Sequence, residues 1–336
     1  MTEALLVIWV ISGLLILRER TVFRMVIYLG LFSLITTLIF LFQGAPDVAL
    51  ASASVSGFST IFLVVCFEKV YGSQDRALVR LRKIRLRKRK QNQSQNSGVF
   101  EPAKPKRGKF SLFQGVAALI FCGAVTAMFI HFLPRQDAST YLMQQYILNF
   151  QTDVGGENAV TAIYLAYRLY DTVFEALMLV VAVVAVVHLS HFDELSFSEG
   201  RQSEIRHSTI AIRTIRIICP IIILFGIYLV ANGHISPGGG FQGGVALAVF
   251  FVCRYMIFNI YDLPIKDVLK DEKIIFLGII LVAIFVIFLG VHQHFPYEHT
   301  EMLQTLYLLM MNTLIGLKVT LGFLMLFYRY VAVDRR

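Results

Sequence analysis

Three ionisable side chains interrupt a hydrophobic stretch in the middle of the chain. Arg168, Asp171 and Glu175 follow one another at spacings of three and four residues, so on a helix they share one face. Arg168 and Asp171 can neutralise each other, which leaves the Glu175 carboxyl about one turn further along, next to Phe174. An unpaired carboxyl in such surroundings either stays neutral, or exchanges a proton or contacts a cation in a hydrated path. The sequence leaves both interpretations open.

A second ionisable residue inside an apolar segment is Lys318, which lies in Leu303–Tyr328 together with Asn312. It is about ten residues from the C-terminal end of that segment, too far for its side chain to reach water comfortably. A buried lysine that gives up its proton readily can relay protons. The same lysine can instead pair with a carboxylate of a neighbouring subunit for assembly alone, so again two interpretations remain.

Two further candidates lie beside turns. Asp47 follows Gly44-Ala45-Pro46, where a proline in the first helical turn and an acid near the positive helix end are ordinary features of a helix start. Contact with a cation at an outer mouth is the alternative for Asp47. His234 begins a glycine-rich turn, where a histidine either stabilises the turn or takes part in proton exchange.

The glycine-rich stretch His234–Gly244 fits a dinucleotide-binding fingerprint, which requires a preceding strand and a soluble helix behind it. Its flanks, Ile215–Val230 and Val245–Ile260, are hydrophobic segments of bilayer length, which excludes that function. A sharp turn at a membrane surface remains. Small residues at four-residue spacing then predict close packing of helix backbones. These residues are Gly239 with Gly243 and Gly240 with Gly244.

The elements that position these residues are membrane-spanning helices. The chain has 336 residues, of which 57% are hydrophobic and 16% charged, whereas a soluble domain has about 25% charged residues. Long apolar runs must be helical in lipid, because lipid cannot satisfy exposed backbone groups. We therefore predict an all-α, polytopic membrane protein with about nine transmembrane helices. The spans are Ala4–Leu17, Val22–Phe42, Val48–Phe67, Leu112–Phe132, a segment ending near His188, Ile215–Val230, Phe241–Ile260, Ile274–Val291 and Leu303–Tyr328.

The positive charge of the chain predicts its orientation. The net charge is +9, but 13 of the 31 Lys and Arg residues lie in one loop, between Arg76 and Lys109. Such clustering is a topology signal and gives no reason to expect nucleic-acid binding. With this loop in the cytoplasm, the N-terminus lies outside and the C-terminus inside, and the predicted outer loops then hold Arg135 and almost no other basic residue.

The path of the chain before His188 stays undecided. Residues 158–188 are compatible with a helix but too long for one perpendicular crossing of about 20 residues. Either an amphipathic surface helix leads into the span, or the helix is tilted and interrupted.

Metal or cofactor ligands are not predicted. The four cysteines are isolated in apolar runs, which is typical of buried small hydrophobic residues. The histidines and acids of 292–301 have irregular spacing, which favours a solvated loop over a metal site.

Three strings resemble one transporter family. Pro237–Gly244, preceded by His234, resembles the signature of the B-type subunit of Mrp-type multisubunit Na+/H+ antiporters. Gly44–Leu50 is similar to the three-helix module at the end of the large A-type subunit, a module that stands as a separate protein in membrane-bound hydrogenases. Asp153–Val160, continuing to Glu175, is similar to the adjoining two-helix module.

The resemblance implies a fusion of modules. Its parts are a three-helix membrane module (1–70), a basic cytoplasmic linker (71–110), a two-helix membrane module (111–192), a cytoplasmic linker (193–212) and a four-helix module like the B-type subunit (213–336). The sequence departs from the family pattern at Ala51 and Ser52, where an acid or amide often follows the Pro-Asp pair. It departs again at Ala166, where an acid is usual.

What the resemblance implies is an accessory subunit of a cation/proton antiporter in a prokaryotic plasma membrane. It would not be an enzyme and would need no cofactor; its partners would be lipid, Na+ and H+, and the large proton-pump-like and small subunits. The implied ion-path residues are Asp47, Arg168, Asp171, Glu175, His234 and Lys318. Two alternatives remain: a membrane-arm subunit of an ion-pumping redox complex, hydrogenase or ferredoxin-linked, and a purely structural scaffold.

Overall fold

A computed structural model describes residues 2–19, 21–67, 123, 136–189, 209–258, 265–289 and 297–333 of the chain. All regular secondary structure in these residues is helical, which confirms the predicted all-α fold. Among the described residues, five helices are long and apolar enough to cross a membrane: Val22–Phe42, Pro46–Phe67, Leu169–His188, Ile212–Asn232 and Met302–Arg329. Each coincides with a predicted span.

Three further predicted spans coincide with helices of the structure. These are α1 (Thr2–Arg18), α9 (Gly240–Phe258) and α10 (Ile265–Leu289). The predicted span Leu112–Phe132 lies outside the described residues, apart from Gly123.

The chain divides into two compact units. Residues 1–74 and 149–336 form one unit, and residues 75–148 form the other. Helix α5 (Gln136–Asp153) begins in the second unit and ends in the first. All the candidate residues belong to the first unit.

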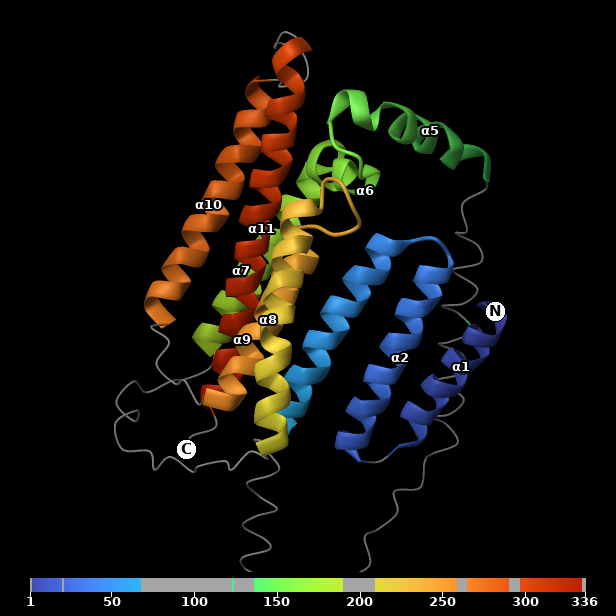
Figure 1. Ribbon diagram of the computed structural model, residues 1–336, viewed down its shortest axis with the longest axis vertical. Helices are drawn as coiled ribbons and strands as arrows, with labels where there is room; N and C mark the ends of the chain where they lie inside the picture. Colours follow the sequence, from blue (N-terminus) through green and yellow to red (C-terminus); the bar gives the residue numbers. More distant parts are fainter. Residues whose placement is uncertain are drawn as a thin grey trace, which may run out of the picture. The chain divides into compact units, whose positions relative to one another are not determined.

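Helices α8 (Thr209–Asn232), α9 and α11 (Tyr297–Val333) pack side by side at the C-terminal end of the chain, with α10 against α11 (Figure 1). Glycine makes this packing possible. A Cβ on Gly243 would lie 2.8 Å from the carbonyl oxygen of Gly226 on α8, and a Cβ on Gly244 would lie 2.6 Å from that of Gly316 on α11. Any side chain at Gly243 or Gly244 would therefore force the helix backbones apart.

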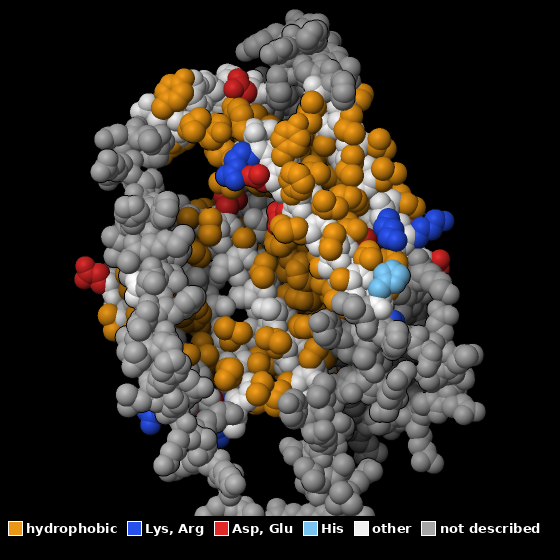
Figure 2. Space-filling view, turned by 180° about the vertical axis from the view of Figure 1, so that it is seen from behind, with side chains coloured by type: hydrophobic (Ala, Val, Ile, Leu, Met, Phe, Trp, Pro, Cys, Tyr) orange, Lys and Arg blue, Asp and Glu red, His pale blue; other side chains and the backbone are white. Residues whose placement is uncertain are grey.

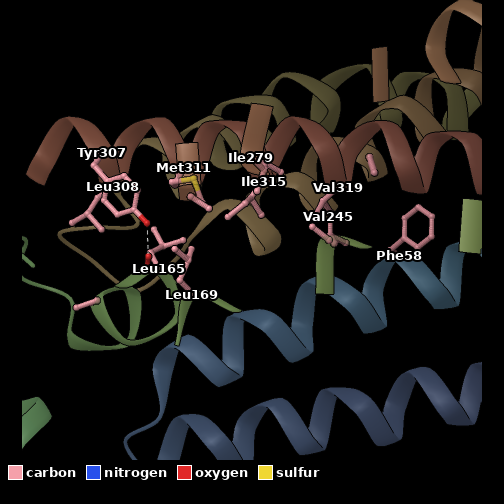
Figure 3. Packing of buried hydrophobic residues seen from close by; sticks show 14 of the residues in the cluster. Phe58, Leu165, Leu169, Val245, Ile279, Tyr307, Leu308, Met311, Ile315 and Val319 are labelled. Carbon is pink, nitrogen blue, oxygen red and sulfur yellow. Dashed lines mark hydrogen bonds between the residues drawn. The ribbon is translucent and has the colours of Figure 1, made fainter. Parts of the chain in front are cut away.

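The N-terminal helices pack in sequence order. Trp9 of α1 donates a hydrogen bond from Nε1 to Thr36 Oγ1 of α2 (Val22–Phe42) at 2.9 Å. The helix Pro46–Phe67 contacts α11, because the ring of Phe58 meets that of Phe323 edge-on at 4.6 Å between centroids. Figure 3 shows Phe58 at one end of the row of buried apolar side chains that follows α11.

The undecided segment before His188 is an interrupted helix. A short α6 (Ala159–Ala162) continues into the π-helical turn η1 (Ile163–Tyr167), and α7 (Leu169–Leu189) follows. Between them Arg168 leaves the helical conformation, with φ −120° and ψ 36°. The second of the two predicted paths, an interrupted helix, is therefore the one the chain takes.

Side chains from elsewhere satisfy backbone groups of the π-helical turn. The Tyr307 hydroxyl of α11 donates to the Leu165 carbonyl, and the Thr172 hydroxyl donates to the Tyr164 carbonyl, each at 2.5 Å. Figure 3 shows the first of these bonds. Such turns are rare and often lie at functional sites.

Candidate functional site

Asp47 joins the first helical module to the glycine-rich turn. Its Oδ1 accepts hydrogen bonds from Asn158 Nδ2 and from the backbone N–H of Gly238, both at 3.1 Å. The Asp47 side chain is buried, with a residue exposure of 7%. A carboxylate that accepts two hydrogen bonds in a buried place is a strong link, because each bond involves a charged acceptor.

Asn158 is the centre of this link. Its Oδ1 accepts from the backbone N–H groups of Val160 at 2.9 Å and Thr161 at 3.4 Å, which caps the start of α6. Its Nδ2 also donates to the carbonyls of Gly233 at 3.2 Å and Ser236 at 3.0 Å. Asn158 therefore ties the interrupted helix to the turn, a role that the sequence analysis missed although a polar residue directly before an apolar run signals a helix cap.

Asn312 holds the other side of the turn. Its Oδ1 accepts from the Tyr164 hydroxyl at 3.0 Å and from the backbone N–H of Gly240 at 3.1 Å. Among the described residues, Asn312 Nδ2 and His234 Nδ1 are buried without a hydrogen-bond partner. Buried polar atoms of this kind are usually satisfied by ordered water. The turn therefore places several buried polar atoms beside Asp47.

Tyr164, on the π-helical turn, links two candidate carboxylates electrostatically. Burial raises the pKa of Tyr164 to about 12, and the negative charges of Asp47 and Glu175 raise it as well. The hydroxyl therefore stays protonated at physiological pH and acts as the donor to Asn312 Oδ1. The sequence analysis did not single out Tyr164.

The three residues predicted to share one helix face are not buried within the described part of the chain. Arg168 lies at the interruption before α7, and Asp171 and Glu175 follow on α7 itself. Arg168 Nε donates to Asp171 Oδ2 at 2.6 Å, and both side chains are more than half exposed. Glu175 is exposed too and makes no hydrogen bond or ion pair with any described residue. Its neighbours Phe174 and Met178 are 60% and 67% exposed. Figure 2 shows how few charged side chains interrupt the hydrophobic surface on one face of the molecule.

Lys318 is fully buried and has a partner within the same chain. Its Nζ forms an ion pair and a hydrogen bond with Oε1 of Glu272 on α10, and both side chains are 0% exposed. The ammonium also lies 6.0 Å from the ring centroid of Phe276. Glu272 Oε2 is buried without a partner among the described residues.

Glu272 was missed because it belongs to a charged run at the start of α10, which the sequence analysis assigned to an inner loop. The spacing of Glu272 relative to apolar residues could have predicted that its side chain is buried. Glu272, Phe276, Ile279 and Ala283 follow one another at intervals of four, three and four, the pattern of one helix face. Glu272, Ile279 and Ala283 are buried, and Phe276 is half-buried.

The six predicted ion-path residues therefore lie in three places. Asp47 and His234 lie at the glycine-rich turn. Arg168 lies directly before α7, which carries Asp171 and Glu175, and Lys318 lies between α10 and α11. No group of three metal-ligating side chains occurs in the described part of the chain. Of the predicted solvated loop 292–301, residues 292–296 lie outside that part, whereas residues 297–301 form the start of α11 and are therefore helical.

Two family models match the chain. Residues 210–325 match the domain related to the MnhB subunit of Na+/H+ antiporters, and residues 7–71 match the D-type subunit of the family described as MBH. The resemblance to the B-type subunit of Mrp-type antiporters, fused to a module known from hydrogenase membrane arms, is thereby confirmed.

Two individual proteins are similar to this chain over different shares of its length. The uncharacterized protein MJ1307 of Methanocaldococcus jannaschii is 26% identical over 64% of this chain and 89% of its own length. The B-type subunit of the Na+/H+ antiporter of Alkalihalophilus pseudofirmus is 35% identical over 24% of this chain and 56% of its own length.

Two solved structures share the fold. A chain of the Mrp complex from Dietzia sp. DQ12-45-1b matches 99% of this chain with a TM-score of 0.69 and 19% identity, and this chain covers 35% of it. A chain of an archaeal membrane-bound sulfane sulfur reductase matches 65% of this chain with a TM-score of 0.54 and 24% identity, over 96% of its own length. These two likenesses show the fold alone. The family-model matches, together with the five helices of spanning length among the described residues, show a multi-pass membrane protein related to antiporter subunits.

Proposed function

We propose that the chain is an accessory membrane subunit of a multisubunit Na+/H+ antiporter, where it contributes to the ion path and to assembly. The matches to the MnhB-related domain and to the MBH domain support this function. We further propose about nine spans, with the N-terminus outside and the C-terminus in the cytoplasm of a prokaryotic cell. The proposed modules are those at 1–70, 111–192 and 213–336, joined by the two linkers.

The outward-facing carboxyl of Glu175 is the observation that carries this proposal. Glu175 is six residues into the apolar helix that starts at Leu169, which places it about 9 Å from that end at 1.5 Å per residue. An ionisable group at such depth costs several kcal/mol against lipid, so it requires a partner or water. The described residues provide no partner for Glu175. We infer that another protein of the complex, such as a large proton-pump-like one, or a part of this chain outside the described residues covers this part of α7.

At such an interface Glu175 can exchange ions by simple competition. The protonated carboxyl releases H+ when Na+ binds to the carboxylate, and the reverse reaction returns the proton. Arg168 and Asp171 neutralise each other beside it and need no further charge. Asp47 and His234 belong to the polar turn next to Tyr164, which senses the charges of Asp47 and Glu175.

A redox-driven host complex is the second candidate. The match of residues 7–71 to the MBH domain and the fold shared with the sulfane sulfur reductase favour it. Neighbouring genes distinguish the two hosts, since genes for nickel–iron or iron–sulfur proteins would indicate the redox complex. In both hosts we propose that the chain handles ions and leaves electron transfer to other subunits.

Sodium-dependent proton exchange in inverted membrane vesicles tests the proposal. We expect the exchange to be abolished by deletion of the chain, and to be lost in Glu175→Gln while the amount of assembled complex stays normal. Glu157→Gln is the matched control, because Glu157 is an exposed acid outside the candidate spans. Unchanged exchange after deletion would rule out a transport role, and unchanged exchange in Glu175→Gln would leave the scaffold alternative.

A further inference from the structure

The ion pair between α10 and α11 is poorly satisfied for two full charges. An ammonium has three N–H donors and a carboxylate has two acceptor oxygens. Among the described residues, Lys318 Nζ donates one hydrogen bond, to Glu272 Oε1, and Glu272 Oε2 has none. A buried ion pair offsets its desolvation only when its remaining donors and acceptors are hydrogen-bonded. The ionised form of this pair is therefore held without its usual support.

The neutral form of the pair relieves this problem. If the proton moves from Lys318 Nζ to Glu272 Oε1, the pair becomes an amine and a carboxylic acid that keep one hydrogen bond between them. Neither group then carries a charge. Burial in an apolar environment disfavours charged groups, so it favours this neutral form. The Phe276 ring, whose centroid lies 6.0 Å from Lys318 Nζ, attracts the ammonium but not the neutral amine, so it supports the charged form. Burial therefore favours the neutral pair, whereas the Phe276 ring favours the ionised pair.

We propose that Glu272 and Lys318 form a proton-exchange pair, a second proton site of the chain, distinct from Glu175. A proton passes from Lys318 Nζ to Glu272 Oε1, and the resulting acid then gives this Oε1 proton to a water molecule, which leaves a carboxylate whose Oε2 accepts a hydrogen bond from water. The neutral amine of Lys318 then takes up a proton and restores the ion pair. This inference rests on the proposed role in ion transport.

Glu272 lies near the charged N-terminal end of α10, between exposed neighbours. Glu272 lies seven residues from the start of α10 at Ile265, about 10 Å along the helix axis. Its neighbours Lys270, Asp271 and Lys273 are exposed, so only one member of the charged run turns inward. Protons therefore need to travel about two helical turns from the charged end of α10 to reach the Glu272 carboxyl.

Other ionisable groups on the packed helices do not compensate the pair. Helix α7, which packs against α10 and α11, carries Asp171, Glu175 and His188, all of them exposed. On α11 itself, Arg329 donates to the Val187 carbonyl at 2.9 Å. The protonation of Glu272 and Lys318 is therefore set mainly by these two groups and by their burial.

A double substitution separates proton exchange from a structural role. Glu272→Gln alone leaves a buried unpaired ammonium, and Lys318→Met alone leaves a buried unpaired carboxylate, so each should lower the yield of the complex. Glu272→Gln with Lys318→Met removes both charges and should restore the yield. We expect this double variant, in inverted vesicles, to lose at least tenfold in sodium-dependent proton exchange. Exchange at the wild-type rate would overturn the proposal. Asp271→Asn with Lys273→Gln, an exposed pair beside it, is the matched control and should exchange normally.

Infrared difference spectroscopy of the assembled complex keeps the proposal testable if the double variant does not assemble. A pH step should change a protonated-carboxyl band that shifts in heavy water and moves in Glu272→Asp, which keeps the acid. A spectrum with no such band across the pH range in which the complex is active would overturn the proposal. This band does not depend on sodium exchange: its presence in a complex without sodium-dependent exchange would contradict the proposed function alone.

Discussion

Substitution of Asp47 should show how strongly one carboxylate holds the glycine-rich turn. In Asp47→Ala the turn loses both bonds to Oδ1, from Asn158 Nδ2 and Gly238 N–H, each at 3.1 Å. A hydrogen bond to a charged group contributes about 1.5–3 kcal/mol, so the two together contribute about 3–6 kcal/mol. Asp47→Asn keeps an oxygen acceptor in the same place and exchanges charged bonds for neutral ones, so we expect about half of that loss.

The assay is thermal unfolding of the purified complex in detergent. The expected loss in Asp47→Ala corresponds to a fall in melting temperature on the order of 5 °C or more, with Asp47→Asn between this variant and the wild type. Asp267→Asn on the exposed face of α10 is the control and should melt like the wild type. A melting temperature of Asp47→Ala equal to that of the wild type would refute the proposed link between the modules.

Three further substitutions test the packing and the π-helical turn. Gly244→Ala would place a Cβ 2.6 Å from the Gly316 carbonyl oxygen, so we expect overpacking to destabilise the complex by about 1–3 kcal/mol, measured as a lower melting temperature. Tyr307→Phe removes the hydrogen bond to the Leu165 carbonyl, and we expect a loss of about 0.5–1.5 kcal/mol in the same assay. The pKa of Tyr164 is raised from 10.0 to about 12, so its contribution to stability is complete below pH 10 and is lost as the pH rises to about 12. Two pKa units correspond to about 3 kcal/mol, and a stability profile of Tyr164→Phe that still shows this alkaline loss would contradict the assignment.

The hydrophobic runs were sufficient to predict most of the helices, since the lengths of spans follow directly from the thickness of the bilayer. The position of Lys318 in an apolar run suggested that its side chain is shielded from water, and in the structure the side chain is 0% exposed within the protein. Its partner Glu272 could not be predicted in the same way. Glu272 sits in a charged run, and only its packing against α11 decides that this acid turns inward while Asp271 and Lys273 stay exposed.

The interruption of the helix before His188 could likewise not be predicted from the sequence alone. Composition allows an unbroken helix through residues 158–188, and the sequence analysis left two paths open. The π-helical turn exists together with hydrogen bonds from Tyr307, which lies 142 residues from Leu165, and from Thr172. A tertiary contact over such a separation leaves no local pattern. The local signal for the start of the segment is Asn158, the capping residue before α6.

A density map of the purified complex in a lipid environment tests the central claim most directly, because it shows what covers Glu175. We predict that another protein of the complex, or water enclosed by it, lies against the stretch from Phe174 to Met178. Ordered lipid chains packed directly on the Glu175 carboxyl would contradict the account.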